Sequence, residues 1–196
     1  MMKSGEKTLL RSRIRQRLRS LSHSVQDSKS TQICSLIEQS DYLAAANPVL
    51  IFAALPGEPN LLPLFEKLHS CQTFCFPRVV GSQLEIRRVP TTADLIPGYA
   101  DILEPSPAAC PLFPVHELKA ILLPGLAFDP ANGGRLGKGK GFYDRLLNEL
   151  RSSSNPSPIT IGVCFSCQLS HVPIQNHDQN VDAIVTEEEI ILTPGS

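Results

Sequence analysis

The residues best suited to chemistry in this 196-residue chain lie in one glycine-rich segment, residues 133–145. Five of its first nine residues are glycine, and glycine lets a backbone approach a ligand closely and direct successive N–H groups toward it. Arg135, Lys138 and Lys140 add positive charge, and a helix is predicted to begin directly afterwards, at about Phe142. Backbone N–H groups, cations and a helix N-terminus together favour the binding of a polyphosphate.

This segment matches neither of two common nucleotide-binding patterns. Gly134-x4-Gly139-Lys140 has the spacing of a Walker A loop, but Gly141 stands where that loop has a Ser or Thr for magnesium. The dinucleotide pattern G-x-G-x-x-G fails as well, because Asp144 takes the place of its last glycine. If the loop binds a nucleotide, Asp144 is the nearest hard ligand for magnesium, which usually takes one or two protein carboxylates and otherwise water and phosphate. A flexible basic surface loop is the alternative interpretation.

The elements that must position this loop follow from the apolar pattern. Continuous apolar runs predict strands buried on both faces at 49–55, 118–123, 159–165 and 181–185. Less regular strands are expected at 73–76 and 84–89, around a turn at 81–82. Helical spacing of apolar residues predicts helices at 10–25, broken and capped at Ser22 or Ser24, then through Ile37, at 61–68 and at 142–151.

Strands that alternate with helices predict an α/β fold, a single layered domain over residues 1–196 with a mostly parallel sheet flanked by helices. Within it, residues 1–45 are expected to form N-terminal helices that pack on the α/β core. Ligands of such sheets bind beyond the carboxyl ends of the strands. The loops after 49–55, 118–123 and 159–165 are therefore the expected site.

Charge is distributed unevenly along the chain. The formal net charge is −1, but residues 1–20 hold seven basic residues and one acidic residue, a net of +6, and the remainder carries −7. A near-neutral total argues against a protein that coats nucleic acid or membrane with its whole surface. The basic start leaves open a nucleic-acid-binding arm or an organellar transit peptide. No apolar run approaches the roughly 18–20 residues that span a bilayer.

The six cysteines lack the spacing of a disulfide framework, and a core of this size needs no bridges, so we predict reduced thiols in a cytoplasmic protein. Two cysteine pairs have the spacing of zinc half-sites, and two histidines follow: Cys164 and Cys167, Cys71 and Cys75, His171 and His177. Cys164 falls in a predicted strand, where residues three apart point to opposite faces, so we do not expect zinc there.

Two motifs near the middle of the chain form a longer pattern: Pro124-Gly125-Leu126-Ala127-Phe128-Asp129, then Arg135-Leu136-Gly137-x-Gly139-x-Gly141-Phe142-Tyr143-Asp144-Arg145. This pattern resembles the signature of the 5-formyltetrahydrofolate cyclo-ligase family. Weaker matches in the family's order extend over nearly the whole chain: Lys7-x-x-Leu10-Arg11, Glu58, Pro77-Arg78, Ile102-Leu103-Glu104-Pro105, Gln168, His177-Asp178 and Val185-Thr186-Glu187. The chain has one residue more between Asp129 and Arg135 than the family usually shows, and Phe142 stands where a tyrosine is usual.

The resemblance implies an α/β layer sandwich and the cyclisation of 5-formyltetrahydrofolate to 5,10-methenyltetrahydrofolate, with ATP as co-substrate, Mg²⁺ as cofactor, and release of ADP and phosphate. Transfer of the γ-phosphoryl of ATP to the formyl oxygen would make that oxygen a leaving group, which N10 of the folate then expels. Such a transfer asks the protein chiefly for positioning and charge neutralisation. The implied partners are these two small molecules, with no nucleic acid and no membrane, and a monomer is expected in the cytoplasm.

The resemblance also implies which residues bind each ligand. Those for ATP are Lys7, Arg11, Arg135, Leu136, Gly137, Lys138, Gly139, Lys140, Gly141, Phe142 and Tyr143. Those for the folate are Ala53, Glu58, Lys138, Gly139, Lys140, Gly141 and Phe142. The catalytic residues would be Lys138, Lys140 and Tyr143, and the metal ligands Asp144 and Asp178.

Two consequences follow from these implied roles. A carboxylate at position 58 suits the pterin, because it accepts two hydrogen bonds from the amino and N–H groups of the ring. Roles for Lys7 and Arg11 weaken the transit-peptide interpretation, since cleavage would discard them. The remaining arginines of the first segment are then expected to be solvated on the helix surface: Arg13, Arg15, Arg17 and Arg19.

Overall fold

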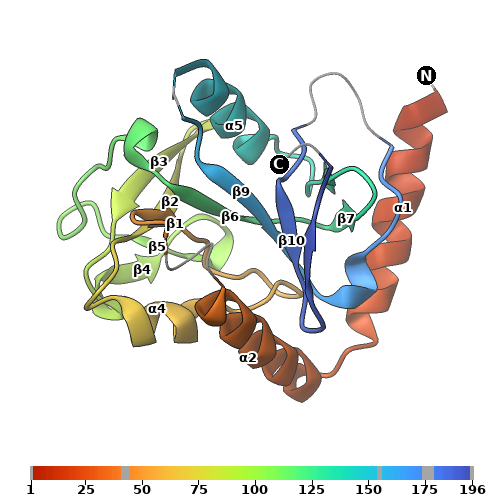
Figure 1. Cartoon of the computed structure of the whole chain (residues 1–196), viewed down its shortest axis with the longest axis horizontal. Coiled ribbons are helices and arrows are strands. Elements are labelled where there is room, and N and C mark those ends of the chain that lie inside the picture. The colour runs from red at the N-terminus through yellow and green to blue at the C-terminus, as the bar shows by residue number, and fades with distance from the viewer. Residues whose placement is uncertain (1, 41–44, 154–155, 174–178, 195–196) are drawn as a thin grey trace.

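The computed structural model describes residues 2–40, 45–153, 156–173 and 179–194. Its centre is a seven-stranded sheet in the order β11-β10-β9-β6-β1-β2-β3 (Figure 1). The five strands from β10 to β2 run parallel, and the two edge strands, β11 and β3, run antiparallel to their neighbours. The bounds are β1 Val49–Leu50, β2 Phe74–Val80, β3 Gln83–Arg88, β6 Ala120–Pro124, β9 Ile159–Val163, β10 Ala183–Val185 and β11 Ile190–Leu192. The predicted α/β fold with a mostly parallel sheet is confirmed.

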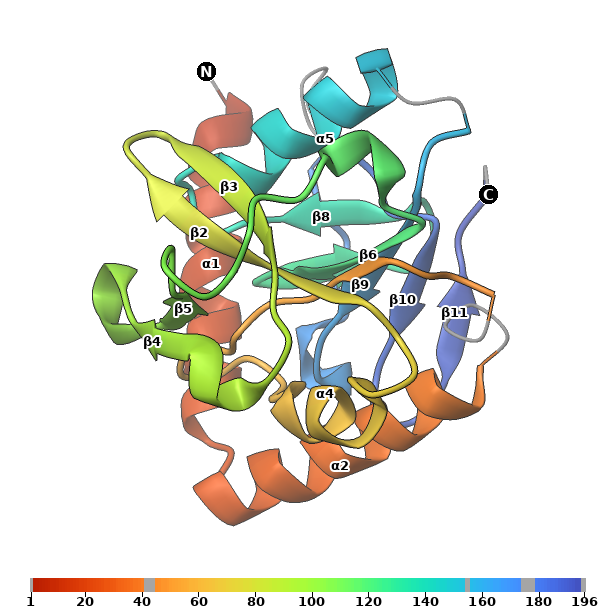
Figure 2. The same ribbon diagram turned by 90° about the vertical axis from the view of Figure 1, so that its left-hand side faces the viewer.

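Helices cover both faces of this sheet. Helices α2 (His23–Gln39) and α4 (Leu62–Leu68) lie on one face, and α5 (Phe142–Ser153) lies on the other (Figures 1 and 2). Strand β6 shows why its sequence is continuously apolar: Leu122 packs in the cluster that includes α2 and α4, and Leu123 packs in the cluster that includes α5. A strand between two helical layers needs apolar side chains at every position.

Helix α1 (Met2–Arg19) lies beside the carboxyl ends of the parallel strands (Figure 1). Its apolar stripe is buried in the core at Leu10, Ile14 and Leu18. The helix also packs against the 3₁₀ turn that follows β9, where Arg17 Nη1 donates to the carbonyl of Cys167 (3.2 Å). The break at Ser22 is confirmed, since Ser22 caps α2 and its hydroxyl accepts from the N–H of Val25 (3.4 Å).

Short elements complete the fold. Two small hairpins pair antiparallel, β4 with β5 and β7 with β8. Their bounds are β4 Leu95–Pro97, β5 Leu103–Pro105, β7 Ala127–Asp129 and β8 Gly134–Leu136. The 3₁₀ turns are η1 Thr92–Asp94, η2 Tyr99–Asp101, η3 Val115–Glu117 and η4 Ser166–Gln168. Among the described residues, no helix is long and apolar enough to cross a bilayer.

The prediction of a strand over 49–55 is wrong in its second half, because β1 ends at Leu50. The N–H of Ile51 still donates to the carbonyl of Cys75 (2.9 Å), and the chain then leaves the sheet in a turn in which the N–H of Glu58 donates to the carbonyl of Leu55 (2.9 Å). Residues 51–53 are apolar because they are buried beyond the strand end. The run 159–165 is shortened for a similar reason, since η4 begins three residues after β9 ends.

The glycine-rich segment was predicted to be a loop up to the start of the helix at about Phe142. This is wrong near its start, because Gly134–Leu136 forms β8. The turn between β7 and β8 spans residues 130–133, with Gly133 in the left-handed region (φ +72°). Buried Asp129 supports this turn, since its carboxylate accepts from the N–H groups of Ala131 and Val172 (3.0 Å each). The additional residue of this chain therefore lies within a hairpin turn, and Gly134 is the first residue of β8.

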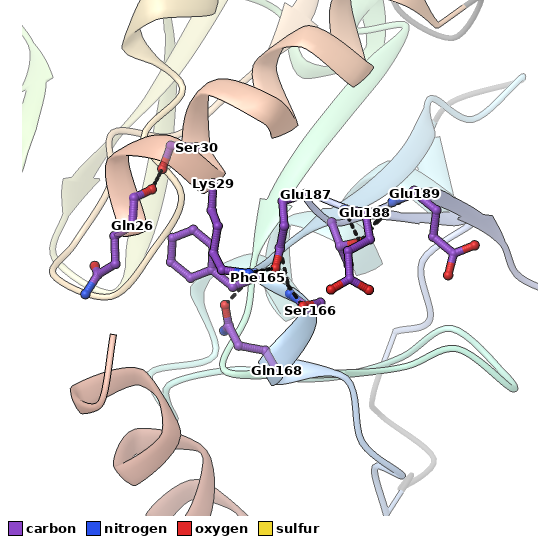
Figure 3. Close-up of polar contacts among 10 residues, drawn as sticks. Gln26, Lys29, Ser30, Phe165, Ser166, Gln168, Glu187, Glu188 and Glu189 are labelled. Carbon is purple, nitrogen blue, oxygen red and sulfur yellow. Dashed lines mark hydrogen bonds and ion pairs between the residues drawn. The ribbon is translucent and has the colours of Figure 1, made fainter. Parts of the chain in front are cut away.

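A half-buried ion pair joins α2 to the carboxyl ends of β9 and β10 (Figure 3). The carboxylate of Glu187 pairs with Lys29 and accepts from the N–H and the hydroxyl of Ser166 (2.8 and 2.6 Å). Burial alone would raise the pKa of Glu187, but the hydrogen bonds from Lys29 and Ser166 outweigh it and hold this pKa below its ordinary value. The folded state therefore binds the ionised form more favourably than the unfolded chain does.

Replacing Glu187 by Gln should lower the free energy of unfolding by about 1.5–3 kcal/mol at neutral pH, because hydrogen bonds to a charged group are lost. The sign follows from the lowered pKa: the contribution is complete above the ordinary value of 4.5 and disappears as the pH falls through the folded-state value. Urea unfolding of both proteins between pH 7 and pH 3 measures this. Glu66→Gln, on the exposed side of α4, shows the effect of removing one carboxylate at the surface. A difference that stays constant down to pH 3 contradicts the prediction.

Candidate active site

A cavity of about 320 Å³ opens beyond the carboxyl ends of the central strands. Apolar and aromatic side chains form much of its wall, among them Phe52, Val79, Tyr99 and Phe142. The ring of Tyr99 meets that of Phe142 edge to face, with centroids 6.2 Å apart. Such a wall suits a flat, largely apolar ring system.

A larger cavity of about 810 Å³ lies beside the first, between α1, the start of α2 and residues 53–60. The two cavities share part of their walls, including Ala53, Glu58, Gly125 and Lys138. The predicted folate-binding residues Ala53 and Glu58 therefore lie at the junction of the two cavities, next to the first lysine of the glycine-rich loop.

An ion pair marks this junction. The carboxylate of Glu58, only 5% exposed, contacts the ammonium of Lys138 at 2.7 Å. Its other oxygen accepts from the N–H of Leu55 (2.9 Å), so the turn after β1 fixes the carboxylate. The side chain of Lys138 is 34% exposed. Two residues 80 positions apart in the sequence, each implied to bind the folate, are thus brought into direct contact.

A second ion pair supports the base of the glycine-rich loop. Arg135, carried by β8, is buried and donates from Nη2 to Asp144 Oδ1 at 2.5 Å and from Nη1 to the carbonyl of Pro124 at 3.1 Å. Its guanidinium also lies 5.8 Å from the centre of the Tyr143 ring. Arg135, implied to bind ATP, thus joins β6, β8 and α5, and its atom Nε has no hydrogen-bond partner within the described residues.

Tyr143 stands in the first turn of α5, on the wall of the smaller cavity. Desolvation, with a further contribution from the Glu58 carboxylate, raises the pKa of its hydroxyl far above the ordinary value, and Arg135 only partly opposes this. The hydroxyl therefore stays protonated at neutral pH and can act as a hydrogen-bond donor.

The N-terminal helix reaches the loop from the other side. Arg11 donates from Nε to the carbonyl of Gly137 (3.4 Å), and Lys7 is buried one turn earlier on α1. Lys140 is exposed, and its side chain lines the smaller cavity. The carbonyl of Lys140 accepts from Arg145, whose guanidinium lies over the ring of Phe142 (5.3 Å). The structure thus gathers the described residues of the implied ATP site around one loop.

The metal ligands are only partly placed. Asp144 lines the smaller cavity, with one oxygen bound to Arg135, while Asp178 lies outside the described residues. Within the described part of the chain, no group of three or more His, Cys, Asp or Glu side chains could hold a metal ion. The strand argument used against zinc was wrong, because Cys164 follows β9 and Cys167 lies in η4, so neither cysteine belongs to the strand.

Sequence reasoning gave two arginines of α1 no place near the site. Arg15 and Arg19 are exposed, as predicted, but they also line the larger cavity, together with His23. The signal was available, because Lys7, Arg11, Arg15 and Arg19 follow one another at steps of four residues, which places them along one side of a helix. Tyr99 and the buried Glu104, which line the smaller cavity, were also missed as site residues. Both belong to the segment of β4 and β5, which was not predicted.

These features define an α/β enzyme with a glycine-rich, cationic loop beside an aromatic pocket at the carboxyl ends of its strands. The model of the 5-formyltetrahydrofolate cyclo-ligase family matches residues 3–187, and the chain belongs to that family. It is therefore a ligase, as predicted.

Individual relatives agree with this assignment. The chain is 28% identical to the mouse 5-formyltetrahydrofolate cyclo-ligase over 194 residues, which covers 91% of this chain and 92% of the relative. It is also 28% identical to the Escherichia coli K12 enzyme over 183 residues, with 90% and 98% covered. The NMR structure of Aquifex aeolicus 5,10-methenyltetrahydrofolate synthetase matches with a TM-score of 0.84 and 28% identity. The match covers 97% of this chain and 94% of the Aquifex chain. A Mycoplasma pneumoniae 5,10-methenyltetrahydrofolate synthetase shares the fold, with a TM-score of 0.71 and 20% identity. That match covers 92% of this chain and 98% of the Mycoplasma chain.

Proposed function

We propose that this chain converts 5-formyltetrahydrofolate to 5,10-methenyltetrahydrofolate in a reaction that consumes ATP and requires Mg²⁺. The observation that carries the proposal is the ion pair between Glu58 and Lys138. It joins a fixed carboxylate of the pocket to the loop that is built to bind phosphate. A phosphoryl group and a folate ring held on either side of this pair would be neighbours.

The smaller cavity would hold the pterin. Its aromatic wall at Tyr99 and Phe142 offers faces and edges for the ring. The carboxylate of Glu58 would accept hydrogen bonds from the amino and N–H groups of the pterin. Because the N–H of Leu55 already fixes this carboxylate, the ring would be oriented by a group that does not move on binding, which favours reaction.

The glycine-rich loop would hold the phosphoryl group during its transfer from ATP to the formyl oxygen. Lys138 and Lys140 would neutralise the charge of the transferred group, with the N–H groups of residues 137–141 and the N-terminus of α5. Lys7 and Arg11 would hold the rest of the triphosphate, and the protonated hydroxyl of Tyr143 would donate to a phosphoryl or formyl oxygen. Attack of N10 on the formyl carbon would then release phosphate.

The described residues fit a magnesium ion that takes most of its ligands from phosphate and water. Asp144 offers one carboxylate at the cavity wall, and its bond to Arg135 fixes the direction of that group. Magnesium commonly binds proteins through one or two carboxylates plus substrate phosphates. We propose Asp144 and Asp178 as these carboxylates; the ion would neutralise charge on the phosphate oxygens.

Purified protein with 5-formyltetrahydrofolate, ATP and Mg²⁺ should form the methenyl product, which is followed by its absorbance, with one ADP released for each product. Omission of ATP or of Mg²⁺ should abolish the signal. An inactive wild-type protein under these conditions contradicts the proposal. We also propose that the enzyme is cytoplasmic, which its six free cysteines favour. We further propose that it is a monomer, and light scattering tests this oligomeric state.

Replacing Glu58 by Gln should lower kcat/KM for the folate by about 10–100-fold, since hydrogen bonds to a charged acceptor contribute about 1.5–3 kcal/mol each. KM for ATP should change less than KM for the folate. Glu85→Gln is the matched control, because Glu85 also forms an ion pair, with Arg87 at 2.8 Å, but lies on β3. Equal losses in the two variants would contradict the role of Glu58.

A further inference from the structure

The larger cavity has a wall of basic residues for which the proposed chemistry has no use. Arg15 and Arg19 stand one turn apart on α1 and both line it, with His23 at the start of α2. Lys138 borders it where it meets the smaller cavity. Two guanidinium groups one helical turn apart can bind two anionic oxygens of the same ligand.

The positive charge of this wall is not neutralised by the protein. Within the described ranges, neither Arg15 nor Arg19 forms an ion pair or a side-chain hydrogen bond. Two acidic residues line the cavity, Glu58 and Asp101. Glu58 is already paired with Lys138, so among the described lining residues Asp101 is the remaining acidic side chain, against two arginines. An anionic ligand would therefore find more positive than negative charge in this cavity.

The shape of the proposed substrate matches the two connected cavities. A reduced folate consists of a flat ring system, an aminobenzoyl group and a glutamate that carries two carboxylates. With the ring in the smaller, aromatic cavity, the remainder would extend past the shared wall at Ala53 and Glu58 into the larger cavity. That wall opens to the arginines, and planar guanidinium groups bind carboxylates through paired hydrogen bonds.

ATP is the competing anion, and the position of its loop disfavours it here. Lys140 and Gly141 line the smaller cavity but not the larger one. Lys7 and Arg11, on the earlier turns of α1, are also absent from the wall of the larger cavity. Lys140 and Gly141 thus border only the smaller cavity, Arg15 and Arg19 border only the larger one, and the Glu58–Lys138 pair lies on the wall that the two cavities share.

We infer that Arg15 and Arg19 form a binding subsite for the glutamate carboxylates of the folate, in the larger cavity. The inference rests on the proposed function and goes beyond it, because it assigns the two arginines and the cavity to a part of the substrate remote from the reacting atoms. Binding energy from such a remote part can fix the position of the reacting part.

The test compares two substrates: 5-formyltetrahydrofolate, and 5-formyltetrahydropteroate, which lacks the glutamate. Wild-type protein should show a KM at least about tenfold lower for the first, since charge-assisted hydrogen bonds are lost with the second. In the double variant Arg15→Gln/Arg19→Gln, KM for 5-formyltetrahydrofolate should rise about tenfold, while KM for the pteroate and KM for ATP should stay close to the wild-type values. Arg88→Gln, an exposed arginine of β3 remote from both cavities, is the control and should change none of these.

Several results would overturn the inference. If the double variant raises KM for both folates equally, the arginines do not contact the glutamate. If it raises only KM for ATP, the cavity binds nucleotide. A wild type that converts both compounds with equal KM also overturns it, whereas a wild type that converts neither contradicts the proposed function itself. Thermal unfolding of the double variant, expected within a few degrees of wild type for surface substitutions, shows that a changed KM is not caused by unfolding.

Discussion

Replacing Lys140 by Ala should lower kcat by about 10²–10³-fold, the range expected when one preorganised group that stabilises transition-state charge is removed. Lys140 lines the smaller cavity and is exposed. Its backbone is held in place, because its carbonyl accepts from Arg145 Nη2 (3.1 Å). The protein can therefore place this charge without first breaking an ion pair, unlike Lys138, which is bound to Glu58.

The measurement is steady-state formation of the methenyl product at saturating ATP and folate. Lys119→Ala is the matched control, because Lys119 is also exposed and lies directly before β6, at the opposite end of the sheet from the loop. Lys140→Arg should retain more activity than Lys140→Ala, since the positive charge is kept. If Lys140→Ala changes only KM for ATP and leaves kcat intact, the residue binds the nucleotide equally before and during the reaction, and the assigned role is wrong.

The second large effect concerns stability. Replacing Phe128 by Ala should lower the free energy of unfolding by about 3–5 kcal/mol, the usual cost of truncating a large buried aromatic side chain. Phe128 lies in β7 and is fully buried. Its ring lies directly against the backbone of β9 at Gly162, where an added Cβ would overlap the ring. Truncation would leave a cavity between the β7–β8 hairpin and the sheet.

Chemical denaturation measures this change, with Leu192→Ala as control, because Leu192 is 57% exposed and should cost less than about 0.5 kcal/mol. Gly162→Ala provides a second test. Alone it should destabilise, since the new methyl group meets the ring, but in the Phe128→Ala background it should cost far less, because the ring is gone. Strictly additive effects of the two substitutions would show that Phe128 and Gly162 are not in contact.

Sequence reasoning recovered the elements whose residues face only other apolar residues. The continuous runs at 118–123 and 159–165 correspond to β6 and β9, because a strand between two helical layers has no polar face. It failed where burial had another cause. Residues 51–53 are apolar because they are buried near the cavity, and the pattern alone cannot separate this from a longer strand.

The site was predicted from a family motif, which indicated the residues in and around the glycine-rich loop. What it missed depends on the tertiary structure. Nothing local in the sequence indicates that Glu58 and Lys138 form an ion pair. The spacing of Arg15 and Arg19 places them on the same side of α1 as Lys7 and Arg11, but it does not show that this side borders a cavity. Both facts arise from the order of the strands in the sheet. This order brings three segments together at the carboxyl ends of the strands: the turn after β1, the loop before α5, and helix α1.

The position of α1 has a consequence for how the site is assembled during synthesis. Two hydrogen bonds from α1 to the body of the protein join residues far apart in the chain, Arg11 with Gly137 and Arg17 with Cys167, which are 126 and 150 positions away. Helix α1 is therefore synthesised well before Gly137 and Cys167, and these two contacts form only after η4 has emerged from the ribosome. At about 5–20 residues per second this delay lasts roughly 6–30 seconds, a period in which a nascent chain is open to aggregation and to chaperones.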